Sequence, residues 1–376
     1  MKILVAGDYC PHDRVATLVA NKQYSPIYNE VIPYCKGSDL AIVNLEAPVT
    51  LNNYSPIKKC GPNLSVNKNA IEALSFMGFN LVTLANNHIM DYGEKGLLDT
   101  IKVCSDFGIE TVGAGKSLKD ASHIYYKRIK DKTLAIINCC EHEFSIASEH
   151  NSGANPLNPI QQYYTITEAK KNADYLLIIV HGGHEHFQLP SPRMINLYHY
   201  FIDLGADTVI NHHQHCYSGY ELYKGKLIFY GLGNFSFDWE NKYNSPWNKG
   251  YMISLDLKDK YPSFDIHPYI QGDLTNPGIT FLRIDDKFNQ EIRKINSIIQ
   301  DPKVLDEYYK AYLKSNLKFC DFCFELYSGK IASKLFFKGI LPSLYPKKKK
   351  VFLENMILCE SHRDKILYYL KHKRHD

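Results

Sequence analysis

The sequence lacks a long apolar run. Its N-terminal segment, MKILVAGD, contains one lysine and five apolar or small residues between Lys2 and Asp8. A secretory signal needs a longer apolar region, and a membrane-spanning helix needs about 20 such residues. The rest of the sequence contains neither. We therefore expect a cytoplasmic protein.

The sequence also carries little net charge, and that charge is unevenly placed. The formal net charge is +4, whereas residues 341–376 hold nine Lys or Arg against four Asp or Glu. The remainder of the chain is therefore close to neutral, so we expect no nucleic-acid binding by the main body. The run Lys347–Lys350 is predicted to be solvated. Alternatively, it holds the protein peripherally at the anionic inner membrane surface.

The ten cysteines show no spacing typical of a disulfide framework. Without an export signal, reduced thiols are the better interpretation. Cys320 and Cys323 form a C-x-x-C, but no second such pair or nearby His pair completes a zinc site. Packing within a helix is favoured for this pair over a metal or redox role.

Short apolar runs alternate with helix-like stretches. The predicted strands are KILVAGD, DLAIVNLE, FNLVTLANNH, TLAIINCCEH, DYLLIIVHGGHEH, ADTVINHHQH and KLIFYGLGNF. The predicted helices lie near 67–78, 94–108 and 191–206, and a glycine stands at or near the end of each. This alternation predicts an α/β protein.

Polar residues stand where the predicted strands end. They are Asp8, Glu46, Asn87 with His88, His181, and His213 with His215. Turn chemistry alone accounts for any one of them. It does not explain why Asp, Glu, Asn and His occur together. Because ligands gather at the carboxyl ends of strands in α/β sheets, the set predicts one shared site.

The alternation stops near residue 285. Residues 288–315 and 350–375 instead have apolar side chains at helical spacing. We therefore expect one α/β domain over 1–285 and a helical C-terminal extension over 286–376.

The mixture of imidazole, amide and carboxylate groups suits a divalent metal of the Mn, Fe or Zn type. Two ions bridged by a carboxylate would activate water and clamp the oxygens of the transition state. The cluster NHHQH supplies His213 and His215, which on a loop would converge on one or two ions.

The ordered motifs resemble the capsule-synthesis protein CapA family, also called the PGA_cap family. They are GD at 7–8, NLE at 44–46, ANNHIMDYG, GAG at 113–115, HGGHEH, HHQH and YGLGNFSFD. That family looks like a branch of the calcineurin-like metallophosphoesterases. The resemblance, over residues 1 to about 240, implies a four-layer α-β-β-α sandwich with two sheets between helices.

The resemblance also implies roles for individual residues. Asp8 and His215 would bind a first metal, Asn87, His181 and His213 a second, and Glu46 would bridge the two. His88 would be the catalytic histidine that protonates the leaving group. The residues expected behind the ligands or against substrate are Arg14, Asp91, Glu185, His212 and Asn234. We expect His184 and His186 at the rim.

One motif departs from the family pattern. Metallophosphoesterases usually begin with D-x-H, whereas this chain has Asp8-Tyr9-Cys10. The first metal therefore lacks the histidine of that motif, although a soft metal could take Cys10. One occupied site and two occupied sites both remain open.

The sequence thus predicts a metal-dependent hydrolase in capsule or surface-polymer synthesis. Metal-activated water would attack a phosphoester, or an amide of a poly-glutamyl polymer. One alternative is a non-catalytic accessory protein that binds the anionic polymer during synthesis or export. The other is a cytoplasmic phosphoesterase that acts on small phosphorylated substrates.

Overall fold

The computed structural model describes residues 1–59, 61–239, 242–257, 262–283, 286–317, 327 and 329–358. The chain divides into two compact units, Met1–Asp306 and Glu307–Asp376. Each unit is described by itself. Cys320, Cys323 and the last part of the basic tail lie outside the described residues.

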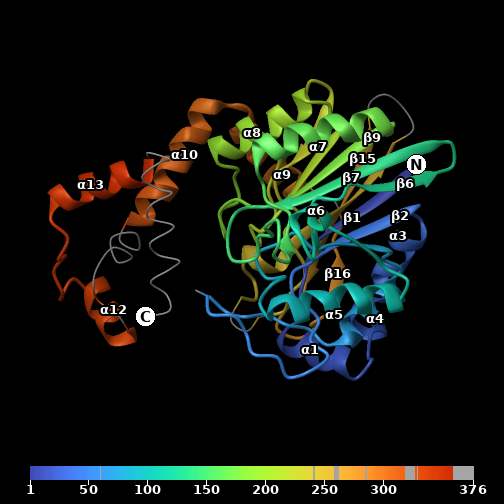
Figure 1. Ribbon diagram of the computed structural model, residues 1–376, viewed down its shortest axis with the longest axis horizontal. Helices are drawn as coiled ribbons and strands as arrows, with labels where there is room; N and C mark the ends of the chain where they lie inside the picture. The colour runs from blue at the N-terminus through green and yellow to red at the C-terminus, as the bar shows by residue number, and fades with distance from the viewer. Residues whose placement is uncertain are drawn as a thin grey trace. The chain divides into compact units, whose positions relative to one another are not determined.

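The first unit contains an eight-stranded sheet with a parallel centre (Figure 1). Its parallel strands are β1 (Lys2–Tyr9), β2 (Leu40–Leu45), β3 (Leu81–Thr83) and β4 (Glu110–Val112), in that spatial order. Beside β1 lie the antiparallel strands β14 (Lys249–Asp256), β15 (Ser263–Gln271) and β16 (Ile279–Phe281). Strand β13 (Asn234–Ser236) also pairs with β1. The carboxyl ends of β1, β2 and β3 therefore lie at one edge.

A second sheet has six strands and faces the first. Its spatial order is β11 (Tyr220–Tyr223), β12 (Lys226–Phe229), β10 (Thr208–His212), β9 (Tyr175–His181), β7 (Lys132–Cys140) and β6 (Tyr125–Ile129). The four central strands are parallel and the two edge strands antiparallel. The short strands β5 (Ala114–Gly115) and β8 (Gly153–Ala154) form a separate pair.

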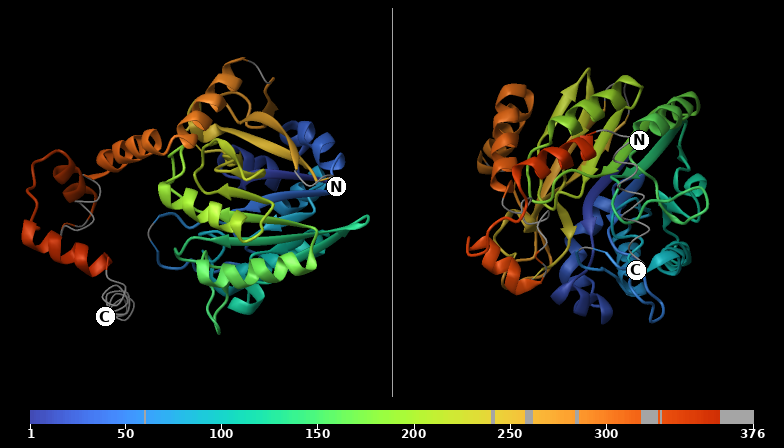
Figure 2. Two further views of the ribbon diagram at one scale, coloured as in Figure 1. Left: turned by 90° about the horizontal axis from the view of Figure 1, so that it is seen from above. Right: turned by 60° about the vertical axis from the view of Figure 1, so that its left-hand side comes forward.

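Three apolar clusters separate four layers. Along β1, Ile3 and Val5 belong to a cluster that also contains Ile136 and Ile179 of the second sheet. Their neighbours Leu4 and Ala6 face the opposite way, because successive side chains of a strand alternate. The structure therefore confirms the α-β-β-α sandwich, which Figure 2 shows from two further directions.

Helices cover the outer face of each sheet (Figure 1). Helices α1 (Asp13–Ala20), α4 (Lys68–Met77) and α5 (Gly93–Asp106) pack on the first sheet. Helices α7 (Pro159–Asn172) and α8 (Pro192–Asp203) pack on the second. The remaining described helices are α2 (Ser25–Tyr28), η1 (Asn29–Val31), α3 (Ile32–Lys36), α6 (Leu118–Ala121), η2 (Pro246–Asn248), α9 (Asp286–Gln300), α10 (Pro302–Ser315), α12 (Lys330–Phe337) and α13 (Lys347–Leu358).

The three helices predicted from sequence are present, with the expected ends. Asn67 caps α4 by accepting a hydrogen bond from the Asn69 N–H, and Gly78 ends that helix at a φ of 100°. Ser191 caps α8, which begins at Pro192. These ends fix where the following strands begin.

The compact first unit continues past residue 285, where the sequence suggested a boundary. Helix α9 buries Ile292 in the cluster between the sheets and Ile299 in the cluster under α7 and α8. Glu291 of α9 also accepts a hydrogen bond from the Tyr217 hydroxyl at 2.5 Å. Residues 286–306 thus pack with the α/β core. The second unit contains α12 and α13. Among the described residues, no helix has the length and apolar character needed to span a membrane.

Candidate metal centre

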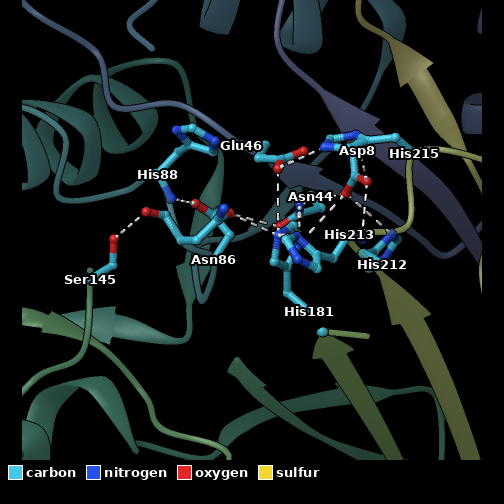
Figure 3. A network of polar contacts seen from close by, with 12 residues as sticks. Asp8, Asn44, Glu46, Asn86, His88, Ser145, His181, His212, His213 and His215 are labelled. Atoms are coloured by element: carbon cyan, nitrogen blue, oxygen red, sulfur yellow. Dashed lines mark hydrogen bonds and ion pairs between the residues drawn. The ribbon is translucent and has the colours of Figure 1, made fainter. Parts of the chain in front are cut away.

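The polar residues that end the predicted strands meet at one place. Figure 3 shows the side chains of Asp8, Glu46, His181, His213 and His215 pointing toward one another. Asp8 comes from the end of β1, Glu46 follows β2, and His181 ends β9 of the second sheet. The site therefore lies where the carboxyl ends of both sheets converge.

Two groups of candidate ligand atoms share one carboxylate. Glu46, His181 and His213 form one group, and Asp8, Glu46 and His215 form the other, with the ligand atoms of each group within 4.8 Å of one another. The Glu46 Oε1 lies 3.5 Å from His181 Nε2 and 3.7 Å from His215 Nε2. Glu46 thus occupies the position expected of a bridging ligand.

Asn87 joins the first of these groups. Its Oδ1 lies 3.1 Å from His181 Nε2, and its backbone carbonyl accepts a hydrogen bond from the Ser145 hydroxyl at 2.8 Å. The Asn86 side chain in turn accepts from the His88 N–H at 3.1 Å. These bonds hold the loop after β3, so that an amide oxygen faces the imidazoles.

Burial determines the charge state of this cluster. Asp8 and Glu46 are at most 1% exposed, and neither oxygen of Glu46 accepts a hydrogen bond from any residue that the structure describes. Burial raises the pKa of Asp8, as does the neighbouring Glu46 charge, and burial raises the pKa of Glu46. Burial and neighbouring imidazoles lower the pKa of His181 and of His213, so both stay neutral, as metal ligation requires.

These features fit a divalent cation. A buried carboxylate without hydrogen-bond donors is costly unless a positive charge compensates it. Two carboxylates, three imidazoles and one amide oxygen are borderline ligands of the kind that Mn, Fe and Zn accept. Asp8, Glu46, Asn87, His181, His213 and His215 would hold the metal.

The loop after β10 is strained at both candidate ligands. His213 has a φ of 94° and His215 a φ of 54°. Residues other than glycine rarely adopt positive φ, and such strain concentrates at functional sites. Here it turns two imidazoles, separated by one residue, toward Glu46. The His213 N–H also donates to Asp8 Oδ2 at 3.2 Å, which ties the loop to β1.

His88 lies in a buried polar contact that the sequence did not indicate. Its Nδ1 is 2.7 Å from Asp91 Oδ2, which is within hydrogen-bond distance. The ammonium of Lys59, whose side chain is 1% exposed, pairs with the other Asp91 oxygen and lies 3.0 Å from His88 Nδ1. Asp91 therefore contacts His88 and orients its ring.

A cavity of about 170 Å³ opens beside His88 and His215. Glu185, predicted near substrate, lines it together with His186. Both residues are exposed, which agrees with the rim position expected for His186.

The other predicted residues occupy supporting positions. His212 is 2% exposed, and its Nδ1 lies 3.6 Å from Asp8 Oδ1. Neither of its ring nitrogens forms a hydrogen bond with a described residue. Asn234 Oδ1 lies 2.8 Å from His215 Nδ1 and orients that ring. Arg14 instead pairs with the buried Asp238, at 2.9 and 2.8 Å. Its guanidinium is therefore engaged within the protein.

Asn44 contacts two of the candidate ligands, Asp8 and His181. Asn44 donates a hydrogen bond to Asp8 Oδ1 at 2.7 Å, and its Nδ2 lies 3.2 Å from His181 Nδ1. The only sequence signal for Asn44 was its place in NLE.

Cys10 is buried in the apolar cluster under α1 and α4 and belongs to neither candidate ligand group. Burial raises the pKa of its thiol, which disfavours the thiolate that a metal would need.

The fold and the site define an α-β-β-α protein with a candidate paired metal centre. The chain belongs to the bacterial capsule synthesis protein PGA_cap family, whose model matches residues 2–239. The resemblance drawn from the motifs is thereby confirmed.

Two curated relatives carry capsule-related names. The chain is 33% identical over 246 residues to the capsule biosynthesis protein CapA of Bacillus anthracis, covering 63% of this chain and 60% of that protein. It is 35% identical over 236 residues to the PGA biosynthesis protein CapA of Bacillus subtilis (strain 168), covering 62% of each. The chain thus spans less than two thirds of the length of these relatives.

Among solved structures, a phosphatase from Mycoplasma pneumoniae aligns with a TM-score of 0.47 and 15% sequence identity. The alignment covers 77% of this chain and 98% of that one. A likeness at this level supports no conclusion about the function of this chain.

We predict that Glu46→Gln lowers metal content. After loading with Mn²⁺ and removal of free ions, the wild type should hold about two ions per chain and the variant at most about one. A neutral amide cannot replace a bridging carboxylate. Metal per chain is measured by elemental analysis, with Glu141→Gln, a carboxylate paired with Arg193, as the control. Unchanged content in Glu46→Gln, or no metal in the wild type, would contradict the assignment.

We also predict that Lys59→Met destabilises the protein by about 3–5 kcal/mol, because it removes the ammonium partner of the buried Asp91 carboxylate. Lys59→Arg should recover part of this loss. Unfolding in urea measures the effect. The matched control is Lys127→Met, which breaks an exposed ion pair with Glu110 and should cost at most about 1 kcal/mol. Equal costs for the two Met variants would show that the buried pair has no special role.

Proposed function

We propose that this protein is a metal-dependent hydrolase that acts in capsule or surface-polymer synthesis. Its substrate would be a phosphoester, or an amide of a poly-glutamyl polymer. The observation that carries the proposal is the buried carboxylate of Glu46. Within the described ranges it accepts no hydrogen bond, and two groups of candidate ligands share it.

Bound ions would supply the chemistry that side chains cannot, by lowering the pKa of a water and polarising the substrate oxygen. Asp8, Glu46 and the imidazoles would hold these ions. Asp91 would orient His88 by accepting a hydrogen bond from its Nδ1–H. With Nδ1 engaged in this way, Nε2 of the protonated imidazole would give its proton to the leaving group.

A non-catalytic accessory role is the second candidate, and one observation favours it. The Asp8 group contains a single imidazole, that of His215, because Cys10 stands two residues after Asp8 and is buried among apolar side chains. An ion held there has fewer strong ligands. A protein with one firmly bound ion would be suited to bind an anionic polymer without hydrolysing it.

For the cellular setting, we propose a cytoplasmic protein that contacts the anionic inner membrane surface peripherally. Lys347–Lys350 begin helix α13, and apolar residues near them are exposed: Leu344 by 51%, Phe352 by 55% and Ile357 by 49%. Basic residues close in sequence to exposed apolar side chains are suited to a membrane interface.

We predict that His88→Ala lowers turnover of bis(p-nitrophenyl) phosphate by the Mn²⁺-loaded protein about 10²–10⁴-fold, the usual contribution of a general acid. Metal content should not change, because His88 is in neither ligand group. The exposed His123, replaced by Ala, is the control. Turnover by the wild type that His88→Ala leaves intact would remove His88 from the mechanism. No turnover by the wild type on any ester or peptide would favour the accessory role.

We predict that replacing Lys347–Lys350 with Gln weakens binding to anionic vesicles. At about 1 kcal/mol per lysine, the loss would be roughly 1000-fold in affinity. Co-sedimentation with phosphatidylserine-containing vesicles measures it, and phosphatidylcholine vesicles are the control. Equal sedimentation of the wild type with both lipids would contradict the proposed contact with an anionic membrane surface.

A further inference from the structure

The cavity beside the metal centre has an aromatic wall. Both tryptophans of the chain, Trp239 and Trp247, line it together with Phe237. His88 and His215 line the same cavity, so the wall lies next to the reacting groups. Pro62 and Leu64 also line it.

This wall is held in place by specific contacts. The Trp247 indole N–H donates to the Phe237 carbonyl at 2.9 Å, and Trp247 is only 7% exposed. Its ring lies 5.1 Å from that of Phe237 and 5.8 Å from that of Trp239, at steep angles of 62° and 78°. His12 stacks on Trp239 with ring centroids 4.7 Å apart and nearly parallel planes. The rings are therefore preorganised.

The size and lining of the cavity indicate what it takes. A cavity of about 150 Å³ lined by apolar side chains is large enough to bind benzene. The cavity here, of about 170 Å³, therefore accommodates one six-membered ring. Besides His88 and His215, the cavity is lined by Glu185 and His186, which can hydrogen-bond ring substituents. Lys242 supplies a positive charge, and its ammonium is 5.3 Å from the Trp247 ring centroid.

We propose that the substrate is a phosphate ester that carries a ring. The ring packs against Trp239 and Trp247, and the phosphoryl group reaches the centre at Glu46. A poly-glutamyl chain has carboxylates but no ring, so it would leave the aromatic wall unused. This inference rests on the proposed hydrolase and narrows its substrate class. A sugar and a nucleobase share the required chemistry, because aromatic side chains stack on both.

Calorimetric titration of the Mn²⁺-loaded protein tests the proposal with three probes: glucose 1-phosphate, adenosine monophosphate and inorganic phosphate. At least one ring-bearing probe should bind about 10-fold more tightly than inorganic phosphate, since a stacked ring contributes about that much. The ring-bearing probe that gains affinity identifies the source as sugar or nucleotide.

Trp239→Ala should abolish this preference for a ring, and Trp239→Phe should restore most of it. Metal content should not change in either variant. Tyr164→Ala, which removes an aromatic side chain that is 68% exposed, is the matched control. A missing preference in the wild type, or one that survives in Trp239→Ala, would overturn the ring subsite alone. Failure of inorganic phosphate to bind to the metal-loaded protein would overturn the phosphoester substrate of the proposed hydrolase as well.

Discussion

The Glu46 carboxylate is the constraint on which the site depends. It is fully buried, and no group in the described part of the chain donates a hydrogen bond to it. Such a carboxylate is costly to bury unless a cation compensates it. Its position is nevertheless fixed, because the Glu46 N–H donates to the Tyr9 carbonyl at 3.0 Å and continues the pairing of β1 with β2. The fold thus holds a negative charge in place for a ligand.

Strand register brings the other groups to this carboxylate. In the first sheet Asp8 stands beside Asn234 on one side and Asn44 on the other, and Asn44 stands beside Thr83. In the second sheet His181 and His212 are direct partners. Because both sheets end their parallel strands at the same edge, these two polar rows face one another. Gly7 permits the close pairing of β1 and β13, since a Cβ there would lie 1.8 Å from the Gly233 carbonyl oxygen.

Seven strands and the strand-end residues could be predicted from the sequence, because each leaves a local pattern. The four layers followed from the resemblance to the family. Apolar runs ending in Asp, Glu, Asn or His marked Asp8, Glu46 and His181, and the structure brings these together. Contacts between distant segments left no such pattern. Lys59 sits in an irregular loop, 29 residues before the histidine it contacts. Residues 286–306 looked like part of a separate helical extension, but which surface an amphipathic helix covers is decided by tertiary packing.

The aromatic wall and the metal centre are physically connected through Asn234. Its side-chain oxygen contacts His215 Nδ1, while its amide donates to the Trp247 carbonyl at 3.0 Å. The His215 ring also lies 4.5 Å from the Trp247 ring. His215 is the sole imidazole of the Asp8 group, so its orientation matters most for the ion that has the fewest strong ligands. A ring packed against Trp247 would contact the same elements that orient His215. Substrate binding and metal retention at the Asp8 group are therefore expected to favour one another. The number of bound ions would then depend on whether substrate is present.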